Sequence, residues 1–167
     1  MSVILGKRSC DLLNKQINEE LNFSYTYLAM SAVFKEMGLD GCSSWMMLQV
    51  EDSYQKAMKI YDHLQKCNVK IKLLPLAAPK QEWRAPLHIL EELVRSQQRM
   101  TSLIHAIYEA SVAEKDCQTQ CFIARFVNDQ AQKENIALRL LDKLRKMQSS
   151  DLGVIMFDAE MISRKIT

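Results

Sequence analysis

The stretch LLNKQINEELNFSYTYLAMSAVF, residues 12–34, decides how the rest of the chain is organised. On a helix with about 3.6 residues per turn, one face of this stretch is an apolar stripe that turns inward against a core. The stripe consists of Leu13, Ile17, Phe23, Tyr27 and Phe34. Glu20 lies in its middle, with Ser24 one turn further on. Because a buried carboxylate needs a cation, a metal ion or a proton, the partner of Glu20 is expected to define the functional site.

Composition favours a single globular domain spanning residues 1–167, with 48% hydrophobic and 25% charged residues. No apolar run is long enough to cross a bilayer, and the opening MSVILGKRSC is too short for a secretory signal, so a cytoplasmic location is expected. A net charge of +2 gives no argument for a nucleic-acid partner, and no membrane partner is expected. The five cysteines are an odd number without a disulfide pattern, so we expect reduced thiols.

Glycine, proline and polar interruptions predict an all-α chain. A first helix is expected over residues 9–37, ended by Gly38, and a second, capped by Ser43, up to about residue 69. After the proline-rich crossover IKLLPLAAPKQEWRAP, a third helix starts at Pro86. The polar segment EKDCQTQ separates it from a fourth that ends near residues 149–150, and a short fifth covers about residues 154–164. Two helical hairpins joined by a long crossover predict a four-helix bundle with a short fifth C-terminal helix.

Each long helix carries polar groups on its otherwise apolar inner face, and in a bundle these groups can converge. Besides Glu20 they are Ser53 and Lys56 on the second helix, Gln97 on the third, and Gln130 and Lys133 on the fourth. Lysine is a donor that repels metal ions, whereas iron and manganese need carboxylate and imidazole ligands. We therefore predict a buried ion pair between Glu20 and Lys133, shared with Lys56, in preference to a metal centre.

Several motifs resemble the non-haem, classical ferritin family over residues 12–165. They are QINEEL and SYTYLAMS in the first helix, GLDGCSSW, EWRAPLHILEEL, DCQTQCFIARFVNDQ and the terminal FDAEMISR. The resemblance implies a ferritin-like four-helix bundle whose long crossover joins the second and third helices (B and C in the family). It also implies assembly into a hollow 24-subunit cage that stores iron, with the fifth helix lining the fourfold axes.

The catalytic di-iron centre of that family carries over only in part. Its first-helix glutamate matches Glu20 and a neighbouring tyrosine matches Tyr27, while Gln130 is kept. The remaining family ligands are, in chain order, a glutamate, a histidine and two further glutamates. They are replaced here by Ser53, Lys56, Gln97 and Lys133. The bridging glutamate corresponds to Ser53, and the histidine to Lys56. The pattern is similar to the catalytically silent light-chain subunits of animals, so a degenerate ferroxidase centre is expected, with Glu20 and Gln130 as the remaining metal-ligand candidates.

Two further features concern haem and soft metal ions. Tyr54 occupies the position of the axial methionine in haem-binding relatives, so no haem is expected. Cys117 and Cys121 are candidates for a soft-metal site in the region that forms channels in ferritin cages.

Three functions are compatible with these residues. The first is an iron-storing cage subunit without ferroxidase chemistry, as a homopolymer or co-assembled with an active subunit. The second is a ferroxidase with a shifted site built from Glu20, Gln130, and Asp52 or Asp129. The third is a cage repurposed for a role without iron, suggested by the basic second helix.

Overall fold

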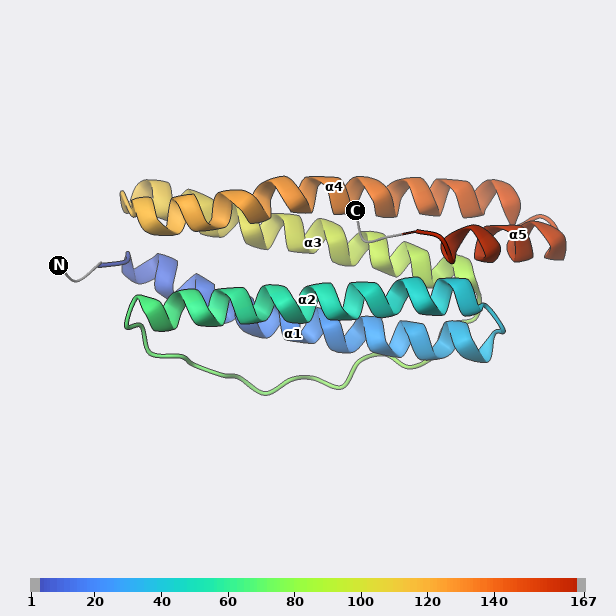
Figure 1. The fold of residues 1–167 in the computed structure, drawn as a ribbon, viewed down its shortest axis with the longest axis horizontal. Coiled ribbons are helices and arrows are strands. Elements are labelled where there is room, and N and C mark those ends of the chain that lie inside the picture. Colours follow the sequence, from blue (N-terminus) through green and yellow to red (C-terminus); the bar gives the residue numbers. More distant parts are fainter. Residues whose placement is uncertain (1–3, 165–167) are drawn as a thin grey trace.

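The computed structural model describes residues 4–164, so both ends of the predicted 1–167 domain lie outside the described residues. Four long helices form two antiparallel hairpins joined by one long crossover, a short fifth helix follows, and the part of the chain from 4 to 164 contains no strand (Figure 1). The helices are α1 (Lys7–Glu36), α2 (Asp40–Lys66), α3 (Pro86–Ala113), α4 (Cys117–Met147) and α5 (Asp151–Met161). The predicted all-α ferritin-like four-helix bundle with a short fifth helix is confirmed. None of these helices is long and apolar enough to span a membrane.

A tight turn joins α1 to α2, and Gly38 makes it possible. Gly38 has φ +75°, a left-handed conformation that glycine adopts without steric cost. Its N–H donates to the carbonyl of Lys35, and the N–H of Leu39 donates to that of Phe34, which is the Schellman pattern. The prediction that Ser43 caps α2 is wrong, because α2 already begins at Asp40. The Ser43 hydroxyl instead donates to the Ser31 carbonyl at 2.9 Å and ties the two helices together.

The crossover, residues 67–85, runs along the whole bundle beside α1 (Figure 1). Two asparagines of α1 hold it through their side-chain amides. Asn14 donates to the Lys70 carbonyl at 3.1 Å and accepts from the Lys72 N–H at 2.8 Å. Asn18 makes the same pair of bonds with the carbonyl and N–H of Leu74, at 2.8 and 3.0 Å. The extended backbone is thus bound as a neighbouring strand would bind it.

The polar interruption after α3 also closes the N-terminal end of α1. Asp116 caps α4 by accepting from the Thr119 N–H at 3.0 Å. Glu114 accepts from the N–H groups of Arg8 and Ser9 at 2.8 and 2.9 Å. The first turn of α1 is therefore capped by a side chain about a hundred residues away in sequence, which no local pattern reveals.

The short helix α5 packs against the beginning of α2 at the opposite end of the bundle (Figure 1). Asp158 accepts from the N–H groups of Gly41 and Cys42 at 3.2 and 2.7 Å, so a carboxylate of α5 satisfies free donors at the start of α2. A Cβ atom at Gly41 would lie 2.0 Å from the Asp158 carbonyl oxygen. Glycine at this position is therefore required for the close approach of α5.

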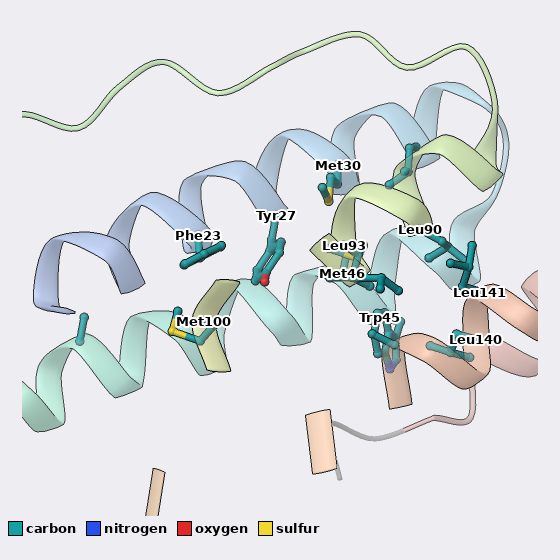
Figure 2. Close-up of a cluster of buried hydrophobic side chains, with 14 of the residues drawn as sticks. Phe23, Tyr27, Met30, Trp45, Met46, Leu90, Leu93, Met100, Leu140 and Leu141 are labelled. Atoms are coloured by element: carbon teal, nitrogen blue, oxygen red, sulfur yellow. The ribbon is translucent and has the colours of Figure 1, made fainter. Parts of the chain in front are cut away.

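The core is formed by the inner faces of the four long helices. At its edge, the half-buried Phe122 of α4 stacks on His63 of α2, with 3.9 Å between ring centroids. All five stripe residues of α1 are buried. Figure 2 shows aromatic, methionine and leucine side chains from the four long helices meeting in the interior, with the Tyr27 hydroxyl pointing inward from α1. That hydroxyl marks where the apolar core gives way to a polar centre.

Candidate functional site

Glu20 lies at the middle of the bundle and is 1% exposed. Burial raises the pKa of its carboxyl to about 7, and this effect outweighs the nearby charges of Lys56 and Lys133, which act in the opposite direction. The Gln16 amide donates to Glu20 Oε1 at 3.2 Å, and Gln16 and Ser53 both act to lower the pKa of Glu20, against the effect of burial. Glu20 is therefore a carboxyl that exchanges a proton near neutral pH.

The predicted ion pair between Glu20 and Lys133 is wrong. Lys133 contacts the carboxylate of Asp52 instead, and neither Lys133 nor Lys56 forms an ion pair with Glu20 among the described residues. The Asp52 side chain is 22% exposed, so its charge is more easily kept than one on the fully buried Glu20. This difference in desolvation is the physical reason that the ammonium group of Lys133 pairs with Asp52.

Lys56 is the second ammonium group of the site and is itself buried. Its Nζ atom lies 3.7 Å from Asp52 Oδ2, so one carboxylate oxygen faces both lysines. Burial lowers the pKa of both amines, that of Lys133 to about 8, while the charge of Glu20 partly restores each. The cluster thus holds two lysines and two carboxyl groups, and burial weakens the tendency of both lysines to carry a charge.

A chain of amides connects the three other polar residues of the centre. Gln97 donates to the Tyr27 hydroxyl at 3.0 Å, and Gln130 donates to Gln97 Oε1 at 2.8 Å. Burial, aided by the charge of Glu20, raises the pKa of the Tyr27 phenol, so it remains a neutral hydroxyl. These bonds fix the side chains of α1, α3 and α4 relative to one another without any metal ion.

All seven predicted site residues surround one small cavity of about 10 Å³, room for a single water molecule. The lining consists of Glu20, Tyr27, Gln49, Asp52, Ser53, Lys56, Gln97, Met100, Gln130 and Lys133. The sequence predicted these seven as site residues but not the contacts of Gln16, Gln49 and Asp52. Within residues 4–164, the buried amide nitrogen of Gln49 and indole nitrogen of Trp45 have no hydrogen-bond partner. Both line a second cavity of the same size, where a water molecule would satisfy them.

The donor set of the centre is poorly suited to metal ions. Across residues 4–164, no group of three or more His, Cys, Asp and Glu side chains is arranged to hold one. Two ammonium groups stand around the cavity, and Asp52 is engaged by Lys133. Glu20 and Gln130, the predicted metal-ligand candidates, therefore share the cavity with two lysines, with amides and with a single further carboxylate that is already paired.

Cys117 and Cys121 lie near one end of the bundle, on the first two turns of α4, whereas the polar centre lies at its middle. Both thiols are exposed. The Cys117 thiol donates a long hydrogen bond to the Lys115 carbonyl, at 3.9 Å. The structure thus separates these two cysteines from the buried polar centre.

Taken together, these features define a class of protein: an antiparallel four-helix bundle with a long crossover, a fifth C-terminal helix and a polar cluster at its centre. The sequence profile of the ferritin family, described as a ferritin-like domain, matches residues 10–147. The chain therefore belongs to the ferritin family.

Individual relatives agree with this assignment. A bacterial non-heme ferritin of Bacteroides fragilis is 27% identical over 161 residues, 96% of this chain and 100% of the relative. One from Campylobacter jejuni is 26% identical over 155 residues, 93% of each chain. Among solved structures, an open pore ferritin from the archaeon Archaeoglobus fulgidus superposes with a TM-score of 0.93 at 31% identity, covering 97% of this chain and 100% of that one.

Proposed function

We propose that this chain is a subunit of a hollow cage that stores iron inside the cytoplasm and that lacks a working ferroxidase centre of its own. The observation that carries the proposal is the pair of ammonium groups, Lys56 and Lys133, on the cavity where Glu20 and Gln130 would otherwise help to bind iron. Family membership supports the storage role and the assembly into 24 subunits, alone or with an active partner subunit.

Electrostatics explains why the centre would remain silent. Two unit charges 4 Å apart interact by roughly 4 kcal/mol at the effective dielectric of a protein site. Each Fe²⁺ ion would be repelled by both lysines, while Asp52 is already neutralised by Lys133. With a pKa of about 7, Glu20 also carries only part of a negative charge at neutral pH. The site therefore offers too little negative charge for two ferrous ions.

The deciding experiment is aerobic oxidation of Fe²⁺ by the purified, assembled protein, followed optically beside a buffer blank. We expect a rate equal to the blank, both for the native protein and for Glu20→Ala. Fast oxidation that Glu20→Ala abolishes would instead support the alternative of a rebuilt centre that recruits Asp52 or Asp129.

A restored variant gives the matching positive control. Ser53→Glu, Lys56→His, Gln97→Glu and Lys133→Glu combined return the family's ligands around the same cavity. This variant should assemble and oxidise Fe²⁺ faster than the blank. If it forms an intact cage but stays inactive, the missing ligands are not the reason for silence, and the proposal would need another cause.

A second candidate is a cage repurposed for cargo other than iron. A groove of about 570 Å³ between α2 and α4 carries Lys59, Lys66 and Arg125, none of which forms an ion pair within residues 4–164. Elemental analysis of cages purified from their native source separates the two functions. Iron at many atoms per subunit supports storage, whereas phosphorus without iron would favour the repurposed cage.

A further inference from the structure

Two exposed thiols are placed side by side at the start of α4. Cys117 is the first residue of the helix and Cys121 lies four residues later. Four residues advance a helix by about 6 Å and rotate it by about 40° beyond a full turn, so the two side chains emerge on one face. The Asp116 cap fixes the first turn that carries Cys117. Thus the helix itself holds the pair at a constant spacing.

The chemistry of two thiols without a third ligand selects a particular kind of ion. Structural zinc sites need four ligands, and the described residues offer no group of three or more suitable side chains here. Soft thiolate ligands select Cu(I), a soft monovalent ion for which two sulfur ligands in a line are sufficient. An exposed helical pair of thiols, with flexible χ1 angles, fits such two-coordinate binding better than it fits a hard cation.

The neighbouring surface carries the charge that a bis-thiolate complex would need. Cys121 borders the groove between α2 and α4, which contains the three unpaired cations Lys59, Lys66 and Arg125. Asp62 and Asp129 are the two carboxylates of the same groove, leaving it a net positive charge. A complex with one negative charge is therefore compatible with this surface.

We infer that Cys117 and Cys121 bind one Cu(I) ion per subunit. Binding replaces two S–H bonds by two Cu–S bonds, so that one Cu⁺ and two thiols give an anionic bis-thiolate complex and two protons, without any change of oxidation state. The site is separate from the buried polar centre and does not depend on the proposed iron function.

Anaerobic titration of the assembled protein with Cu(I), in competition with the chromophoric chelator bicinchoninate, tests this inference. The native protein should withdraw one more equivalent of Cu(I) per subunit than Cys117→Ser or Cys121→Ser. Each single substitution should remove the whole equivalent, because one thiolate cannot hold the ion against the chelator. Cys10→Ser and Cys67→Ser are matched controls elsewhere in the fold, and they should bind as the native protein does.

His63→Ala tests whether a third ligand takes part. The His63 ring also lines the groove, and its buried Nε2 atom has no hydrogen-bond partner. Two-coordinate binding predicts that Cu(I) uptake is unchanged in this variant. The inference is overturned if the native protein takes no Cu(I) from the chelator, if Cys117→Ser and Cys121→Ser bind as much as the native protein, or if His63→Ala removes the equivalent. Size-exclusion chromatography confirms that each variant is assembled before titration.

Discussion

Replacing Lys133 by alanine should weaken the bundle by stranding Asp52. Loss of one partner from a fully buried ion pair costs about 3–5 kcal/mol. Here the side chains of Lys133 and Asp52 are 12% and 22% exposed, and Lys56 remains 3.7 Å from the same carboxylate oxygen. Water and Lys56 therefore compensate in part, so we expect a loss of about 1–3 kcal/mol. For a chain of this size that is a fall in Tm of about 2–12 °C.

Thermal unfolding at one fixed protein concentration is the appropriate assay, because assembly makes Tm depend on concentration. Lys59→Ala, at an exposed lysine without an ion pair, is the matched control and should change stability by less than about 0.5 kcal/mol. A fall in Tm no larger than that of the control would refute the structural reasoning.

A double-mutant cycle then identifies the partner of Lys133. Asp52→Asn combined with Lys133→Met should show a coupling energy of about 0.5–3 kcal/mol, since the two groups are in contact. Glu20→Gln combined with Lys133→Met should show a smaller coupling, because these residues do not form an ion pair. A larger coupling energy between Lys133 and Glu20 than between Lys133 and Asp52 would instead support the ion pair predicted from the sequence.

Three further predictions concern other parts of the fold. Because the pKa of Glu20 is raised from 4.5 to about 7, the folded protein binds more protons than the unfolded chain between these values. Its unfolding free energy should therefore fall as pH rises from 4.5 to about 7. In chemical denaturation measured at several pH values, Glu20→Gln should make the unfolding free energy less dependent on pH in this range. An unchanged pH dependence would contradict the raised pKa of Glu20. Gly41→Ala forces a Cβ atom against the Asp158 carbonyl, so the free energy of unfolding should fall by about 1–3 kcal/mol. Amide hydrogens of residues 151–161 should then exchange faster. Exchange as slow as in the native protein would contradict the close approach of α5 to Gly41. Glu114→Ala removes the distant cap of α1 and should cost about 1 kcal/mol in chemical denaturation, while Glu109→Ala, without such a role, should cost little.

The sequence predicts much of the fold because the helix periodicity is clear. The stripe around Glu20, the helix end at Gly38 and the separation of two helices by the segment EKDCQTQ each depend on residues close in sequence, and all three are confirmed, although α4 already begins at Cys117. The predicted start of α2 was wrong because serine is a common N-cap residue, whereas the Ser43 hydroxyl donates a hydrogen bond to the Ser31 carbonyl. Local chemistry allows both uses, and only the packing of two helices selects one.

The candidate site shows where prediction from sequence stops. Helix faces alone predicted that six polar residues would converge, because their positions depend on periodicity, and the family resemblance added Tyr27; all seven line one cavity. The partner of Lys133 depends on a competition between Glu20 and Asp52, which differ in burial and in side-chain reach. Such differences exist only once four helices have packed, so the sequence could give the members of the cluster but not its pairing.

The hydrogen bonds from Asn14 and Asn18 to the crossover also oppose domain swapping between copies of this chain. In a crowded assembly of identical subunits, two chains could exchange hairpins by extending the segment between α2 and α3. Asn14 and Asn18 oppose this, because together they make four hydrogen bonds to that segment. A domain-swapped dimer would have to give up these bonds or re-form them with the partner's crossover. Residues 67–85 therefore act as a restraint that keeps each bundle closed on its own chain.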